Sequence, residues 1–401
     1  MTAESTDQTR ESLGPLARRK RTQTISSIGV LSRGGNSFGL LRIVLACSVI
    51  ISHSWTIGGF GDEPLSALSR GSVTLGSLGV CCFFALSGVL VGRSAERLPA
   101  GTYLWHRCRR ILPGFWACLI VTAFGFGSLI AVVRGMSIMT LWQPASETAT
   151  TFVTRNFTLG IGQYRLGSVL EGLPFPDAVN GSLWSIVYEF ACYLAVLAVV
   201  RVWLVSGQRH SVLAAIAALS VVMAVIVEVA PGSDAGFVTF PLLGALDAYQ
   251  FFTLWAVFMV GTLVGLFADR IPFTPLLIGF AAMVCAVTLP LGWFRATGAL
   301  TLPYLLVGIA YYLPRWTRNI GVKRDVSYGL YLYGFPVGQL LVAAGIGGSA
   351  PLLALASVVV TAPVAALSWF GIECPMLDLD GSAWTQRLTR FRKTRDDTTK
   401  G

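Results

Sequence analysis

The sequence predicts an all-α, polytopic integral membrane protein with about ten transmembrane helices and with both termini in the cytoplasm. Charged residues make up only 12% of the 401 residues, about half the share of roughly 25% that is usual in soluble domains. Hydrophobic residues make up 54%, and the mean hydropathy is +0.67. So few charges cannot cover the surface of soluble domains of this size, and the high apolar content excludes a disordered chain.

Apolar runs alternate with polar segments along the whole chain. A helix needs about 20 apolar residues to cross a bilayer, and the first run approaches that length. The predicted spans are, in order, 39–55, 73–92, 113–133, 183–204, 211–229, 249–267, 275–293, 299–313, 327–345 and 350–370. We therefore predict a transmembrane domain at 39–376, flanked by a flexible basic cytoplasmic tail at 1–38 and a basic cytoplasmic tail at 377–401.

Basic residues gather on one side of these spans, which predicts the orientation. With the N-terminus inside, 24 of the 30 Lys and Arg residues fall in cytoplasmic segments, and only five fall outside: Arg70, Arg134, Arg155, Arg165 and Arg295. The same bias explains the net charge of +10, so we expect a lipid bilayer and no nucleic acid as partner. The longest external segment, roughly 134–182, can cover an external cavity. No pattern specifies an oligomeric state.

The eight cysteines form no CxxC pair and no Cys/His cluster with the spacing of zinc ligands. Six of them lie inside apolar runs, where cysteine behaves as a small hydrophobic residue. We therefore expect neither a disulfide nor a bound metal.

The first span carries two basic side chains at membrane depth, where an ionisable residue is costly and indicates function. Arg42 and His53 are eleven residues apart, which is close to three helical turns and places them on one face about 16 Å apart. Arg42 lies at the cytoplasmic end and His53 in the outer half. The alternative is that Arg42 only extends to the membrane surface and that His53 is an ordinary interfacial histidine.

The second span contains Ser87 and Gly88, small residues that allow two helices to approach closely. Ser87 has no neighbouring base in the sequence, so we do not expect it to be a nucleophile. After this span, Arg107, Arg109 and Arg110 precede Pro113, which we expect to begin the next helix. Arginines beside the free N–H groups of a helix start suit phosphate binding; ordinary topology charge or contact with anionic lipid is the alternative.

The fourth span contains Glu189, one to two turns inside a segment that is otherwise free of charge. Ser185 lies one turn earlier on the same face. A buried carboxylate requires a partner, and His53 or an arginine is the natural candidate. Glu228 and Asp247 lie near span ends and have the character of interfacial residues.

These residues belong to six short patterns that run in order over roughly 38–376. They are Arg42 with His53, the segment 79–88, Arg107 with Arg110 before Pro113, the segment 182–189, the segment 327–332, and Glu373 with Pro375. Together they resemble the acyltransferase-3 family of integral membrane acyltransferases, the O-antigen and polysaccharide O-acetylase type. The sequence departs from the family pattern in two motifs. Cys81 and Cys82 replace a frequent acidic residue, and Gly334 lies where a histidine is common.

The resemblance implies a membrane O-acyltransferase of the bacterial inner (plasma) membrane. The donor would be acetyl-CoA or another acyl-CoA from the cytoplasm, with its phosphates bound by Arg42, Arg107 and Arg110. The acceptor would be a hydroxyl of a carbohydrate, a glycolipid or a secreted glycosylated compound at the external face. We expect His53 to be the general base or a transient acyl carrier, and Glu189 to orient its imidazole.

Two other functions fit part of the same evidence. Intramembrane arginine, histidine and glutamate also suit a proton-coupled transporter or a lipid flippase, although no inverted repeat is evident. A polytopic glycosyltransferase would need an external acidic base, for which Asp62, Glu63 and Asp177 are the candidates. Consumption of acyl-CoA by the purified protein separates these functions from an acyltransferase.

Overall fold

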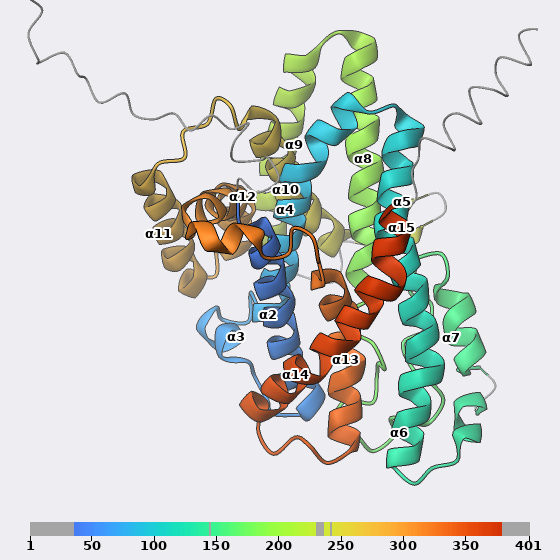
Figure 1. The fold of residues 1–401 in the computed structure, drawn as a ribbon. Coiled ribbons are helices and arrows are strands. Elements are labelled where there is room, and N and C mark those ends of the chain that lie inside the picture. Colours follow the sequence, from blue (N-terminus) through green and yellow to red (C-terminus); the bar gives the residue numbers. More distant parts are fainter. Residues whose placement is uncertain (1–35, 144–145, 230–235, 241–242, 379–401) are drawn as a thin grey trace, which may run out of the picture.

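The computed structural model describes residues 36–143, 146–229, 236–240 and 243–378 (Figure 1). Within these ranges the protein is almost wholly helical. The helices are α2 (Phe38–Gly58), α3 (Pro64–Leu68), α4 (Leu75–Arg97), α5 (Ala100–Ile120), α6 (Gly127–Val133), α7 (Ala149–Asn156), α8 (Trp184–Ser206), α9 (Arg209–Val229), α10 (Ala248–Phe267), α11 (Pro275–Leu291), α12 (Phe294–Tyr312), α13 (Ser327–Ala343), α14 (Ala350–Ser368) and α15 (Cys374–Asp378). Almost all of the predicted tails 1–38 and 377–401 lies outside the described residues.

Short elements of other kinds connect these helices. Two are π-helical turns, η2 (Val121–Phe126) and η6 (Trp369–Glu373), and two are 3-10 turns, η3 (Ile138–Trp142) and η5 (Arg315–Asn319). The strands β1 (Phe237–Phe240) and β2 (Gly244–Asp247) pair as an antiparallel hairpin. The prediction of an all-α chain misses this hairpin, because 237–247 lies between two predicted spans, where the sequence predicts only a connection.

Six described helical segments are long and apolar enough to cross a membrane: Phe38–Gly58, Leu75–Arg97, Ala100–Val133, Trp184–Ser206, Ala248–Phe267 and Ala350–Leu377. The other four predicted spans coincide with α9, α11, α12 and α13, and their crossing stays a prediction. Large apolar side chains face outward, including Leu276 at 82% exposure and Leu367 at 75%. An outward apolar surface of this kind requires lipid rather than water, so this is a multi-pass membrane protein.

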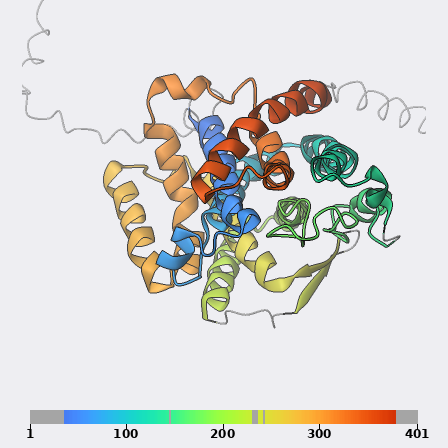
Figure 2. The ribbon, with the colours of Figure 1, turned by 90° about the horizontal axis from the view of Figure 1, so that it is seen from below.

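Close packing of α4 against α10 forms the centre of the molecule, as the small residues of the second span predict. A Cβ atom at Gly88 would lie 2.1 Å from the carbonyl oxygen of Phe258, and one at Gly261 would lie 2.4 Å from that of Ala85. Glycine is required at both positions because the two backbones touch. Seen from below, α2 lies near the middle, with α11 and α12 on one side of it and α5 to α7 on the other (Figure 2).

The start of α5 differs from the prediction. The helix begins at Ala100 after Pro99, and Pro113 lies inside it rather than at its first turn. The connection from α4 consists of Leu98 and Pro99 alone, so the arginines that the sequence assigns to a loop are helical. They therefore have no free backbone N–H groups beside them, and the helix-start argument for phosphate binding does not hold.

Candidate active site

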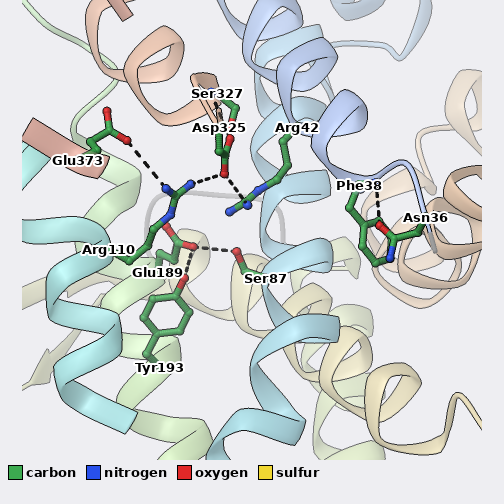
Figure 3. Close-up of polar contacts among 10 residues, drawn as sticks. All are labelled: Asn36, Phe38, Arg42, Ser87, Arg110, Glu189, Tyr193, Asp325, Ser327 and Glu373. Atoms are coloured by element: carbon green, nitrogen blue, oxygen red, sulfur yellow. Dashed lines mark hydrogen bonds and ion pairs between the residues drawn. The ribbon is translucent and has the colours of Figure 1, made fainter. Parts of the chain in front are cut away.

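Two arginines from different helices share one carboxylate (Figure 3). Arg42 on α2 contacts Asp325 at 2.9 Å (Nη1 to Oδ2), and Arg110 on α5 contacts the same oxygen at 2.6 Å through Nη2. The other oxygen, Oδ1, accepts a hydrogen bond of 2.5 Å from the Ser327 hydroxyl at the start of α13. Asp325 thus joins three helices that are distant in the sequence.

The carboxylate of Asp325 is ionised despite its burial. Its side chain is only 12% exposed, and it lies in the segment before α13, outside the membrane-spanning helices. Burial disfavours the charged form, but the guanidinium groups of Arg42 and Arg110 outweigh it and lower the pKa of Asp325 to about 2. Two positive charges and one negative charge therefore meet at this point at neutral pH.

Glu373 lies on the other side of Arg110. The π-helical turn η6 carries it, and π-helical turns are frequent at functional sites. Its Oε2 lies 3.9 Å from Nη1 of Arg110, and its Oε1 accepts a hydrogen bond of 3.0 Å from Ser368. Arg110 is consequently held between two carboxylates from different segments.

Glu189 on α8 lies beside this cluster and bonds to uncharged groups. The carboxylate oxygen Oε1 accepts hydrogen bonds from the hydroxyl of Ser87, at 2.8 Å, and from that of Tyr193, at 2.5 Å. The side chains around these groups enclose a cavity of about 60 Å³, which we call the arginine cavity; it is lined by Arg42, Val80, Phe83, Phe84, Ser87, Arg110, Ile111, Ser185, Ile186, Glu189, Tyr193, Ser327, Tyr328 and Tyr331.

Arg107 does not join Arg42 and Arg110 around Asp325. Its guanidinium carbon lies 5.7 Å from the ring centre of Tyr103 and 5.6 Å from that of Tyr193. Its buried Nε has no hydrogen-bond partner within the described ranges. Of the three arginines predicted to bind phosphate, Arg42 and Arg110 therefore lie together, whereas Arg107 lies apart from them. Arg107 stacks against Tyr193, which lines the arginine cavity.

His53 lies in a second and larger cavity. This histidine cavity has a volume of about 400 Å³ and is lined by Val49, Ser52, His53, Trp55, Thr56, Gly61, Asp62, Glu63, Ser66, Thr74, Gly76, Ser77, Val80, Phe175, Gly181, Trp184, Tyr331 and Phe335. The imidazole meets the edge of the Phe335 ring, with 4.9 Å between ring centres. The cavity therefore combines aromatic walls with one imidazole and two carboxylates.

The buried carboxylate of Glu63 holds together the wall of the histidine cavity. It accepts a hydrogen bond from the Ser52 hydroxyl on α2 and one of 2.6 Å from the backbone N–H of Leu75, the first residue of α4. Glu63 is thus committed to linking two helices, whereas Asp62 is exposed. Of the two carboxylates that line the histidine cavity, Asp62 is the more accessible to a ligand.

The predicted external segment 134–182 reaches the histidine cavity, since Phe175 and Gly181 line it. The amide of Gln339 on α13 donates hydrogen bonds of 2.8 Å to the carbonyl oxygens of Phe175 and Ala178. These bonds fix residues 175–178 beside the cavity, and the covering of the cavity by the whole segment stays a prediction.

The two cavities are neighbours, since Val80 and Tyr331 line both. The Tyr331 hydroxyl lies 2.6 Å from the hydroxyl of Ser185 and donates to the carbonyl oxygen of Ser182 at 2.8 Å. Arg42 and His53 both lie on α2 and line different cavities. The expected contact of Glu189 with His53 does not form within the described residues, because Ser87 and Tyr193 satisfy the carboxylate instead.

Sequence reasoning missed Asp325. The residue follows Lys323 and Arg324 in a polar segment, so it had the pattern of an ordinary surface loop. The available signal was its place two residues before Ser327, from which an aspartate accepts the bonds of a helix start. Its two arginine partners are too distant in the sequence to be inferred from spacing.

Comparisons with known proteins agree with the motif pattern. Residues 36–370 match the profile of an acyltransferase domain. Nodulation protein 10 of Rhizobium leguminosarum bv. viciae is 27% identical over 88% of this chain and 96% of that protein. An O-acetyl transferase of Shigella phage Sf6 is 26% identical over 86% of this chain and 99% of its own length. No solved structure matches the chain. Because the profile covers most of the chain, this protein belongs to the acyltransferase-3 family.

Proposed function

We propose that the protein transfers an acyl group, in the first instance acetyl, from cytoplasmic acyl-CoA to a sugar hydroxyl at the external face of a bacterial plasma membrane. Membership of an acyltransferase family and similarity to a protein named O-acetyl transferase support the reaction class. The structural observation that carries the proposal is that the arginine and histidine cavities are neighbours, with Val80 and Tyr331 lining both. In this proposal the thioester extends from Arg42 past these two side chains towards His53.

The arginine cavity is suited to the phosphates of the donor. Asp325 holds the guanidinium groups of Arg42 and Arg110 at one point before any donor arrives, and each guanidinium retains further N–H donors for phosphate oxygens. Arg107 lies against the ring of Tyr193, which lines this cavity, and so adds a third positive charge near it. Groups held in place beforehand lose little conformational freedom on binding, which favours affinity.

The histidine cavity is suited to the acceptor. The imidazole of His53 would take the proton of the acceptor hydroxyl while the hydroxyl oxygen attacks the thioester carbonyl. The new ester forms as the carbon–sulfur bond breaks, and the CoA thiolate leaves and receives that proton. In the alternative order, the imidazole attacks first and an acyl-imidazole passes the acyl group to the hydroxyl.

Donor binding by the purified protein tests the proposal. We would mix the full-length protein in nanodiscs with acetyl-CoA labelled in the acetyl group, without acceptor, and measure bound donor, free CoA and label on the protein. We expect wild type and His53→Ala to bind the donor equally and only wild type to release CoA slowly, with water as acceptor. Label that requires His53 would favour the covalent order, and absence of donor binding would contradict the proposal.

A further inference from the structure

A third cavity lies beside the histidine cavity, between α4, α10 and α12. It has a volume of about 140 Å³, and its polar wall consists of Ser72, Tyr249, Gln250, Thr253 and Arg295. Ser77, Val80 and Trp184 line both this cavity and the histidine cavity. The two cavities are therefore neighbours, and we call the third one the Arg295 cavity.

The guanidinium of Arg295 has no carboxylate partner in the described part of the chain. Its nearest feature is the ring of Tyr249, with the guanidinium carbon 5.3 Å from the ring centre. The carboxylate of Glu228 contacts the residue next to Arg295. Its Oε2 accepts a hydrogen bond of 2.7 Å from the backbone N–H of Ala296, in the first turn of α12. The charge of Arg295 is thus left for a ligand.

One hydroxyl group of the same cavity is unsatisfied, and a second faces Arg295. The buried oxygen atom of Ser72 has no hydrogen-bond partner among the described residues, whereas the Tyr249 hydroxyl interacts with the Arg295 guanidinium. Buried polar atoms are nearly always paired, and leaving one unpaired is costly. Donor groups from three segments thus line a cavity that has no carboxylate among its lining residues, which is the composition expected of a site for a negatively charged oxygen group.

We propose that the Arg295 cavity binds an anionic group of the acceptor, a carboxylate or a phosphate on the sugar whose hydroxyl lies at His53. This assignment of the acceptor class rests on the proposed acyltransferase function. The guanidinium would bind the two anionic oxygens side by side, and the hydroxyls of Ser72 and Tyr249 would donate to them. Trp184, shared by both cavities, would contact the sugar ring between the anion and the reacting hydroxyl.

Binding of small charged sugars tests this site without acyl transfer. The probes are glucuronate, glucose 1-phosphate and glucose, titrated into the full-length protein in nanodiscs without acyl-CoA, with affinity measured by calorimetry. We expect wild type to bind at least one charged sugar about tenfold or more tightly than glucose, the usual scale of one charge-assisted contact. Preference for glucuronate would identify a carboxylate, and preference for glucose 1-phosphate would identify a phosphate.

Matched variants test whether the preference for charged sugars depends on Arg295. Arg295→Gln is expected to remove the preference, Arg295→Lys to retain part of it, and Arg165→Gln to leave it unchanged. Arg165 is a suitable control because it is predicted to be external and pairs with Asp177 at an exposed position. Equal affinity for all three sugars, binding of none of them at millimolar concentration, or full preference in a folded Arg295→Gln protein would overturn the assignment.

Donor binding, measured on the same preparations, keeps the two proposals apart. Arg295 lies outside the arginine cavity, so Arg295→Gln is expected to bind acetyl-CoA as wild type does. Loss of charged-sugar preference with normal donor binding supports both proposals. A wild-type protein that prefers charged sugars but binds no acetyl-CoA would refute the acyltransferase function and leave the anion site in place.

Discussion

The arginine cavity and the histidine cavity differ in how far their charged groups are already bonded to the protein. In the arginine cavity, about 60 Å³ in volume, Arg42 and Arg110 are bonded to Asp325. In the histidine cavity, about 400 Å³ in volume, the recorded contact of His53 is an aromatic edge. A small site with internal ion pairs suits a compact anionic group, such as one phosphate of the proposed donor. A wide site with an uncommitted base suits acceptors of differing shape.

The comparison predicts that the two cavities affect different kinetic constants, and the largest effect is expected at His53. His53→Ala should lower the turnover of acetyl-CoA by about 10²–10⁴-fold, the usual contribution of a general base, without changing donor affinity. Measurement of CoA release and of donor Kd separates the two constants. His106→Ala is the control, since His106 lies on α5 outside the described cavities. Retention of most turnover in His53→Ala would remove this histidine from the chemistry.

The second largest effect is expected on stability, at Asp325. Asp325→Asn removes the charge that Arg42 and Arg110 share and leaves two buried guanidinium groups facing each other. Loss of one partner of a buried ion pair costs about 3–5 kcal/mol, so a large drop in melting temperature is expected. Asp269→Asn is the control, because Asp269 pairs with Arg93 at an exposed position where its side chain is 54% exposed and such pairs contribute little.

The pH dependence of the melting temperature of Asp325→Asn tests whether the loss of stability comes from the ion pairs of Asp325. The pKa of Asp325 lies at about 2 in the folded protein and near 3.8 without its partners. A folded-state pKa below the unfolded value means that the ion pairs stabilise fully above about pH 4 and are lost as the pH falls towards 2. The difference in melting temperature between wild type and Asp325→Asn should therefore be constant from pH 5 to 8 and shrink below pH 4. A difference that already shrinks near pH 6 would contradict this assignment.

A third, smaller effect distinguishes the arginines that the sequence grouped together. Arg110 contacts Asp325 and lines the arginine cavity, whereas Arg107 lies against aromatic rings outside it. Arg110→Ala should weaken acetyl-CoA binding by about tenfold or more, and Arg107→Ala by less. Arg110→Lys keeps the charge but loses the two-pronged geometry, so an intermediate affinity is expected. Equal losses of acetyl-CoA affinity in Arg107→Ala and Arg110→Ala would show that lining the arginine cavity does not decide which arginine binds the donor.

The sequence predicted the helical regions and the shared face of Arg42 and His53, because both follow from local periodicity. It failed where a contact joins distant segments. Glu189 had a plausible partner in His53, but the partner that forms is the hydroxyl of Ser87, which comes from another helix. Asp325 contacts Arg42, Arg110 and Ser327 only because the fold brings α2, α5 and α13 together. Pro113 was wrongly placed at a helix start because Pro99, fourteen residues earlier, already serves that purpose.

The smallest effect is expected at Ser87, which lines the arginine cavity and donates a hydrogen bond to Glu189. Ser87→Ala removes one of the two hydrogen bonds to Glu189 and leaves the one from Tyr193. A hydrogen bond to a charged group contributes about 1.5–3 kcal/mol, and the remaining bond offsets part of this loss, so a severalfold change in turnover is expected. Tyr193→Phe, which removes the other bond, should have a similar effect. If Ser87→Ala instead abolishes turnover as His53→Ala does, Ser87 takes part in the chemistry and the division between a binding cavity and a reacting cavity fails.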